Sequence, residues 1–407
     1  MRLYDAPLLS LLSTAAASTL HRPVAPSHSH APARLWATHY NGNVYSLSLS
    51  GSELAITDTQ KTCGNMPSWL TFDAESKTLY CSDEDGTTDP STHGSLSAYA
   101  VSHDGKLKQV AKTETVGGGV YSAIFEAGAG DKYPCYRALR RRRRLNLPTP
   151  PNQQRDLQTS LPLQTNPPRR NPPNQDTPHP HSIFLDPTGS FLVSPDLGRR
   201  PPPHLLHRPL LRHFTHLSLR QSTARRPRAR AQRRTSARSP LSAKTQLYIV
   251  NEIGGTLMVF DVSYARDGCL DLSVRQTVVP YGKHNATMPK GATPAEIRLL
   301  GEQVYVSVRS DGGFAGNDSV VTLDRAPSDG TVSVRGRSPA LGKVPRTMAV
   351  NRAGDLVAIG NQASATVAIV RRNRETGDLG EKIAVLQVGE PGKVGSAEGL
   401  SSVIWED

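Results

Sequence analysis

The chain has 407 residues, enough for one large domain or two of ordinary size. Its formal net charge of +13 is concentrated between Arg137 and Lys244, where 22 basic residues stand against four acidic ones. The remaining residues are mildly acidic, and the arginine run at 140–144 has no interleaved aromatic residues of the kind that nucleic-acid modules use. We therefore expect no nucleic-acid partner.

The first 20 residues resemble a secretory signal peptide. One early arginine precedes a short apolar run at 8–12 and a small-residue Ala-Ala-Ala site at 15–17. An unstructured N-terminal tail and a cytoplasmic location are the alternative. No later segment approaches the roughly 20 apolar residues of a membrane helix, so we expect an extracellular protein without a membrane partner.

If the chain is secreted, four further residues are candidates for covalent modification. Cys63 and Cys81 flank one short strand pair, and in an oxidising compartment they are candidates for a disulfide. The alternative is two small buried residues. Asn285 and Asn317 begin Asn-x-Ser/Thr sequons and are candidate glycosylation sites.

Residues 35–407 repeat one unit, which we interpret as a β-propeller domain. In each unit an apolar strand, a turn and a second apolar strand with polar residues at its end precede two further strands. Alternation with period two and turn residues between the runs predict short antiparallel strands, and four strands every 45–50 residues or so are typical of propeller blades. The matching segments, in chain order, are 35–47, 68–84, 94–110, 181–197, 246–262, 295–323, 346–370 and 401–405.

The two ends of this repeat complement each other. The first unit lacks an opening strand, and the segment 401–405 lacks the strands that should follow it. We expect these ends to share one blade, because closing the ring removes the exposed strand edges of an open array. The expected fold is all-β, a seven-bladed propeller. At their polar strand ends, His39 and Asp83 are expected to be solvated.

Two basic, proline-rich segments, 137–174 and 199–243, interrupt the expected blades three to five. One interpretation is a pair of disordered basic insertions. The other is translation out of frame, because a one-nucleotide shift with GC-rich codons restores the missing strands at both places. We favour the second interpretation, which predicts incomplete blades in the chain as written.

The ordered set of motifs resembles the lactonase family of seven-bladed propellers, of the fungal secreted type. This family includes bacterial 6-phosphogluconolactonase and fungal carboxy-cis,cis-muconate cyclase. The resemblance covers about two thirds of the chain. It is carried by His179-Pro-His181 with 186–198, 247–252 with 256–260, 295–297 with 304–309, and 345–347 with 360–362.

The resemblance implies an active site at one mouth of the propeller and assigns roles to five residues. The catalytic histidine is His179 or His181, the glutamate is Glu252, an arginine is Arg309, and Arg346 is a substrate-binding candidate. A further family arginine, in a Gly-Pro-Arg-His motif, is expected shortly before residue 247, where this chain reads Arg-Ala-Gln-Arg-Arg-Thr-Ser.

These residue types suit hydrolysis of a lactone. A histidine or glutamate serves as general base for water, and arginines bind carboxylate, phosphate or a developing oxyanion. Each has a structural alternative, such as a capping histidine or a paired carboxylate at a strand end. The leading function is a 6-phosphogluconolactonase-like hydrolase acting on a sugar lactone or related ring ester.

Two other functions stay open. A carboxy-cis,cis-muconate cycloisomerase needs the same groups, and an inactive or non-catalytic secreted propeller would bind a ligand at its mouth. The sequence contains no Cys-x-x-Cys or His-Glu-x-x-His spacing, so we expect neither a metal nor a cofactor.

Overall fold

The computed structural model divides the chain into two compact units, Met1–Ala31 and Pro32–Asp407. The structure describes residues 32–86, 93–127, 131–138, 181–185, 187, 192–193, 195, 245–264, 270–282 and 286–407. The expected signal peptide lies outside these ranges. Within them every regular element is a β-strand, and no helix that could cross a membrane is found.

The strands form seven antiparallel sheets, which we number as blades 1 to 7 in chain order. Four blades have four strands: blade 1 with β23 (Leu400–Trp405), β1 (Ala33–His39), β2 (Val44–Ser50) and β3 (Glu53–Gln60); blade 2 with β4 (Pro67–Asp73), β5 (Thr78–Asp83), β6 (His93–Val101) and β7 (Leu107–Val116); blade 6 with β15 (Thr293–Leu300), β16 (Gln303–Arg309), β17 (Ser319–Arg325) and β18 (Val332–Pro339); blade 7 with β19 (Pro345–Val350), β20 (Leu356–Asn361), β21 (Thr366–Arg372) and β22 (Leu379–Gln387).

Three consecutive blades have fewer strands in the described ranges. Blade 3 consists of β8 (Gly119–Ala127) and β9 (Asp131–Ala138), blade 4 of β10 (Phe184–Leu185) and β11 (Leu192–Val193), and blade 5 of β12 (Thr245–Asn251), β13 (Thr256–Tyr264) and β14 (Leu270–Val278). The first basic segment was expected to start at Arg137, but strand β9 continues to Ala138, so the first two residues of that segment belong to the strand. The rest of both basic segments lies outside the described residues.

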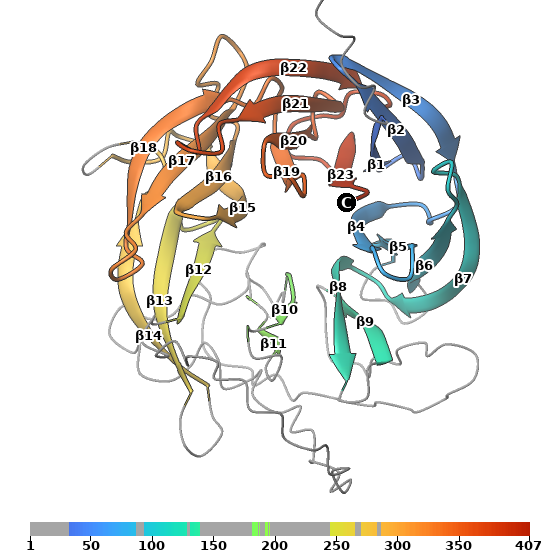
Figure 1. Ribbon diagram of the computed structural model, residues 1–407, viewed down its shortest axis with the longest axis horizontal. Coiled ribbons are helices and arrows are strands. Elements are labelled where there is room, and N and C mark those ends of the chain that lie inside the picture. Colours follow the sequence, from blue (N-terminus) through green and yellow to red (C-terminus); the bar gives the residue numbers. More distant parts are fainter. Residues whose placement is uncertain are drawn as a thin grey trace, which may run out of the picture. The chain divides into compact units, whose positions relative to one another are not determined.

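Blade 1 joins the two ends of the propeller domain. Strand β23 pairs with β1 in antiparallel register, with Leu35 opposite Trp405 and Ala37 opposite Val403. The predicted seven-bladed, all-β fold and its closure by shared strands are thus confirmed. The seven sheets follow one another in chain order in Figure 1, with β23 beside β1 and β4.

Neighbouring blades pack face to face through apolar side chains. Leu35 of β1 shares a buried cluster with Ile369 of β21, and Trp36 of the same strand shares another with Leu79 of β5. Adjacent strand residues point to opposite faces, so one strand supplies both clusters.

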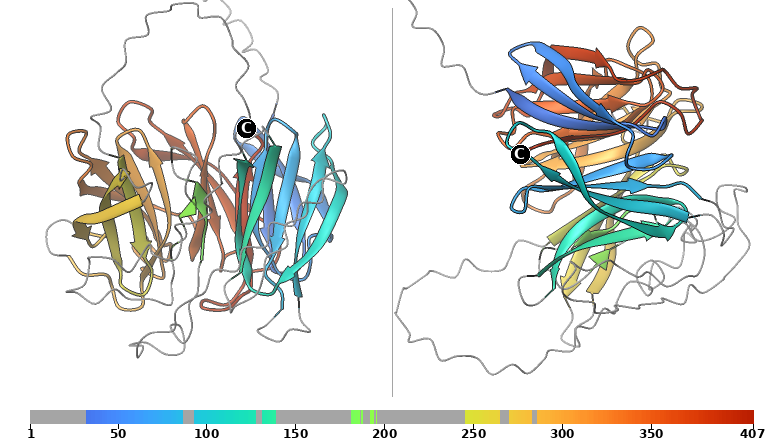
Figure 2. Two further views of the ribbon diagram at one scale, coloured as in Figure 1. Left: turned by 90° about the horizontal axis from the view of Figure 1, so that it is seen from below. Right: turned by 90° about the vertical axis from the view of Figure 1, so that its right-hand side faces the viewer.

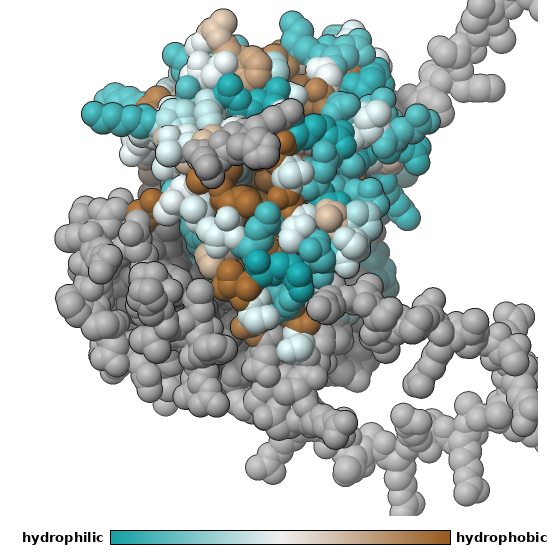
Figure 3. All heavy atoms as spheres, turned by 90° about the vertical axis from the view of Figure 1, so that its left-hand side faces the viewer, coloured by the Kyte–Doolittle hydropathy of each residue, from teal (hydrophilic) through white to brown (hydrophobic). Residues whose placement is uncertain are grey.

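Figure 3 shows the outer side formed by β13, β14, β17 and β18, where apolar surface gathers between polar margins.

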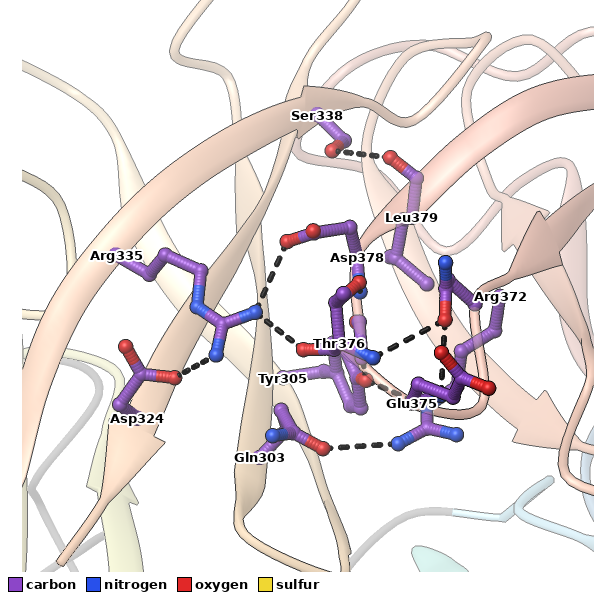
Figure 4. Close-up of polar contacts among 12 residues, drawn as sticks. Gln303, Tyr305, Asp324, Arg335, Ser338, Arg372, Glu375, Thr376, Asp378 and Leu379 are labelled. Atoms are coloured by element: carbon purple, nitrogen blue, oxygen red, sulfur yellow. Dashed lines mark hydrogen bonds and ion pairs between the residues drawn. The ribbon is translucent and has the colours of Figure 1, made fainter.

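A polar latch ties blade 6 to blade 7 (Figure 4). The Tyr305 hydroxyl donates to the carbonyl of Gly377 at 2.6 Å and accepts from Nε of Arg372 at 2.6 Å. Nη2 of Arg372 donates to Oε1 of Gln303 at 2.9 Å. The guanidinium therefore enters the interface with hydrogen-bond partners already in place, which offsets its loss of water.

The same latch is repeated one blade earlier. The Tyr248 hydroxyl donates to Gly330 at 2.7 Å and accepts from Nε of Arg325 at 2.8 Å, while Nη2 of that arginine reaches Gln246 at 3.0 Å. In both cases a Gln-x-Tyr segment, of β16 in blade 6 and of β12 in blade 5, meets an arginine and a hairpin glycine of the next blade. Blade 5 is therefore joined to blade 6 by the contacts that join blade 6 to blade 7.

Candidate active site

The register of the blades brings two kinds of strand end together. Pro67 pairs with Asp83, Thr293 with Arg309, and Pro345 with Asn361, and the two members of each pair lie 16 residues apart. In blades 2, 6 and 7 the start of the first strand therefore lies beside the end of the second strand. Seen from the side, the strands of the blades run between two opposite faces (Figure 2), so these ends collect at one of them.

Irregular strand pairing in β15 and β19 changes the direction of two side chains, Glu296 and Arg346. The β19–β20 ladder passes from Pro345 to Thr347, which leaves Arg346 outside the pairing, and the β15–β16 ladder passes from Pro294 to Ile297, which leaves out Ala295 and Glu296. An extra residue in one strand bends it and redirects its side chain. Arg346 and Glu296 are thereby free to face the cluster of polar groups rather than the neighbouring blade.

Glu252 and Arg309 form an ion pair across blades 5 and 6. Glu252 follows β12 and Arg309 ends β16, and Nη1 of the arginine donates to Oε1 of the glutamate at 2.8 Å. Nε of Arg309 is buried and has no hydrogen-bond partner among the described residues. Burial lowers the pKa of Arg309, and the Glu252 carboxylate opposes this effect. The pair thus keeps one donor available.

His181 comes from blade 4 and meets the same groups. Its backbone N donates to the carbonyl of Pro195 at 2.9 Å, which fixes the chain just before β10. The protein surrounding the ring, and after it the charge of Arg346, lowers the pKa of His181 to about 4, although solvent still reaches the side chain. The imidazole is therefore neutral near neutral pH.

Three further groups meet at blades 1, 2 and 7. Tyr40 follows β1 and Glu84 follows β5, and both side chains interact electrostatically with Arg346. The Arg346 guanidinium lies 5.5 Å from the centroid of the Tyr40 ring. Burial raises the pKa of both Tyr40 and Glu84, while the charge of Arg346 opposes the rise.

A second ion pair and three aromatic side chains also belong to this part of the propeller. Nη1 of Arg298 lies 3.1 Å from Oε1 of Glu296, and Nε of the same arginine donates to the carbonyl of Met348 at 2.8 Å. Burial raises the pKa of Glu296. The ring of Tyr121 lies 4.3 Å from that of Trp69 and 5.4 Å from that of Phe184, so rings of blades 2, 3 and 4 are in contact.

The structure brings together four of the five sequence-derived site residues, His181, Glu252, Arg309 and Arg346. His179 and the region of the expected Gly-Pro-Arg-His motif lie outside the described residues. Sequence reasoning missed Tyr40, Glu84 and Glu296. Tyr40 directly follows β1 and Glu84 directly follows β5, as Glu252 directly follows β12, and this shared position at a strand end was the signal that could have identified them.

The expectation that His39 and Asp83 are solvated was wrong. Both are buried, with 4% and 5% of their surface exposed. The ring of His39 contacts the Glu390 carbonyl at 2.8 Å, and Asp83 accepts from the backbone of Met66 and from the Ser95 hydroxyl. They precede Tyr40 and Glu84 by one residue and therefore point the other way, into the protein.

The remaining sequence-derived residues lie away from this cluster. Cys63 and Cys81 are joined in a disulfide and are fully buried. Asn317 closes a tight turn with Phe314 through two backbone hydrogen bonds, and Asn285 lies outside the described residues. In the part of the chain that the structure describes, no group of three or more His, Cys, Asp or Glu side chains is arranged to hold a metal ion.

Comparison with known proteins agrees with this architecture. A family model described as "Lactonase, 7-bladed beta-propeller" matches residues 34–395. The chain belongs to this lactonase family. A protein of Arthroderma benhamiae named "Probable 6-phosphogluconolactonase" is 26% identical over 296 residues, and the alignment spans 66% of each chain, just under two thirds of that relative's length.

Two further relatives are informative. A 6-phosphogluconolactonase of Formosa agariphila is 33% identical over 79 residues, which are 19% of this chain and 21% of that one. The solved periplasmic gluconolactonase of Pseudomonas aeruginosa superposes with a TM-score of 0.61 at 20% identity, covering 89% of this chain and 98% of its own. At 20% identity, the similarity to the Pseudomonas structure shows that the two chains share a fold.

Proposed function

We propose that this lactonase-family chain hydrolyses a sugar lactone or a related ring ester. The observation that carries the proposal is the meeting of an imidazole, a carboxylate and two guanidinium groups, His181, Glu252, Arg309 and Arg346, from blades 4 to 7. Ester hydrolysis needs a base for water and positive charge for the developing oxyanion, and this set supplies both.

The proposed roles follow the bonds that form and break. Glu252 accepts a proton from water as the water oxygen bonds to the lactone carbonyl carbon. The free Nε of Arg309 stabilises the resulting oxyanion. The ring C–O bond then breaks, and the proton taken up by Glu252 passes by way of His181 to the leaving oxygen, which gives a hydroxy acid and restores both side chains. The Arg346 guanidinium binds an anionic group of the substrate or the new carboxylate.

Turnover by the full chain tests the function. We expect hydrolysis of 6-phosphogluconolactone or gluconolactone above the spontaneous rate, and loss of that excess in Arg309→Gln. Replacement of the exposed Arg374 by Gln is the matched control and should leave the rate unchanged. Turnover of carboxymuconate in place of both lactones, or of none of the three, would refute the assignment.

The finer features of the chain are also proposals. We infer that it is secreted, that it carries glycans at Asn285 and Asn317, and that the segments 137–174 and 199–243 arise from out-of-frame translation. The buried disulfide supports an oxidising compartment, and the three smaller sheets adjoin the two basic segments. A continuous reading frame through both segments in mature mRNA would refute the last inference.

A further inference from the structure

Arg346 differs in its contacts from the two other arginines of the site. Arg309 pairs with Glu252, and Arg298 pairs with Glu296. Within the described residues, by contrast, the Arg346 guanidinium makes neither an ion pair within 4 Å nor a hydrogen bond. The side chain is nevertheless only partly exposed to solvent. The described part of the protein thus leaves its N–H donors to a ligand.

The contact that holds Arg346 is the face of an aromatic ring. Cζ of the arginine lies over the Tyr40 ring, 5.5 Å from its centroid, a distance typical of a cation–π interaction. A ring face attracts positive charge without taking up the N–H donors of the guanidinium. Those donors form a planar fork that matches the oxygens of a carboxylate or a phosphate. Tyr40 therefore holds the guanidinium and leaves the fork free.

The charge of Arg346 is balanced by several carboxylates rather than by one. Glu84, Glu252 and Glu296 all attract it from beyond ion-pair distance, and two of them are engaged with other arginines. Attraction between charges that are not in contact falls slowly with distance, so it does not fix how a guanidinium is oriented. The contact with Tyr40 is the one described here that can do so.

Tyr40 is itself anchored where blade 1 meets blade 7. Its backbone N donates to the Gly399 carbonyl at 3.0 Å. The ring of the preceding residue, His39, accepts from the backbone N of Asn41 at 3.0 Å and contacts the Glu390 carbonyl at 2.8 Å. Tyr40 therefore follows directly on a buried, hydrogen-bonded residue, and its ring can serve as a fixed support.

We propose that Tyr40 is a positioning residue, which holds Arg346 as a subsite for an anionic group of the ligand. The group recognised is a phosphate-like or carboxylate group. The proposal rests on the proposed function only for the sugar that carries this group. Tyr40 acts through Arg346, so loss of its ring should weaken anion binding although every charged side chain of the site is retained.

Calorimetric titration of the full chain with sulfate and with gluconate, at neutral pH and constant ionic strength, tests the proposal. Sulfate stands for a phosphate-like group, and gluconate carries the carboxylate that lactone hydrolysis would release. Binding of only one of them identifies the group recognised. We expect Tyr40→Phe to bind as the parent does, because the ring remains. Tyr40→Leu and Tyr40→Met should each bind roughly tenfold more weakly, because the ring is lost.

A double variant separates positioning from packing. Arg346→Gln should weaken anion binding at least as much as Tyr40→Leu, and combining the two changes should cause no further loss, because the tyrosine acts through the arginine. With a phosphorylated lactone as substrate, Tyr40→Leu should raise KM far more than it lowers kcat. That pattern is expected when an interaction common to the ground state and the transition state is lost.

The matched control is Tyr281→Leu. The Tyr281 ring lies 4.4 Å from Cζ of Arg337, so this change removes a contact of the same kind between other strands, and the variant should bind anions as the parent does. Parent-like binding by either folded non-aromatic variant, equal weakening in Tyr40→Phe, or no binding of either anion by the parent would overturn the proposal. These binding results do not depend on lactone turnover, so they are distinguishable from failure of the proposed hydrolysis.

Discussion

The latch between blades 6 and 7 allows a quantitative test of how this ring is held together. Tyr305 is 2% exposed, and changing it to Phe removes a hydroxyl that serves two partners, the Gly377 carbonyl and Nε of Arg372. Each buried group left without a partner costs about 1–3 kcal/mol. Arg372 keeps its bonds to Gln303 and to the Gly354 carbonyl, so we expect a loss of about 2–4 kcal/mol in the free energy of unfolding.

The equivalent change in the preceding latch provides the comparison. Tyr248 makes the same two hydrogen bonds but is only partly buried, so water can replace the lost hydroxyl. We expect Tyr248→Phe to cost about 1 kcal/mol. The assay is urea unfolding of both variants, followed by intrinsic fluorescence and compared by midpoint at equal slope. Equal losses in the two variants would refute the reasoning, because burial would then not decide the cost.

Three further predictions concern the site and the disulfide. Glu252→Gln should lower kcat for lactone hydrolysis about 100-fold if it is the general base, whereas Glu302→Gln, at an exposed turn, should not; equal rates would remove the assignment. Between about pH 6.5 and about pH 4 the unfolded chain binds a proton at His181 that the folded chain does not. The free energy of unfolding should therefore fall as pH falls through this window, and His181→Gln should flatten that fall. An unchanged pH profile in the variant would contradict the lowered pKa of His181. Replacing Cys63 and Cys81 by Ala should cost about 3 kcal/mol, since they are 18 residues apart; a loss near zero in chemical unfolding would show that the bridge does not form.

Local sequence patterns predicted the strands well because each strand carries its own alternation. The segment 246–262 contains two apolar runs separated by a turn with two glycines, and it forms β12 and β13 as one hairpin. The glutamate after the first run, Glu252, was assigned from the resemblance to the lactonase family, which these local motifs carry. Such signals depend only on neighbours along the chain.

The neighbouring site residues show where that reasoning stops. His39 and Tyr40 are adjacent, as are Asp83 and Glu84; in each pair the first residue was expected to be solvated and the second was given no role. Which of two successive residues faces the site depends on the register with β23 or β4, and on irregular pairing at the strand start. Register is set by contacts between strands, and a one-residue difference exchanges the two faces.

By itself, the sequence determined the all-β composition of the propeller, the shared blade that closes it, the candidate disulfide and the strand ends that carry polar groups. These features follow from alternation, turn residues and spacing, which act over a few residues. Only the tertiary structure decided that Arg309 is paired with Glu252, that Arg346 lies beside the Tyr40 ring, and that His181 is neutral near neutral pH. The physical reason is that charge, burial and hydrogen bonding at this site depend on blades whose residues lie far apart in the chain.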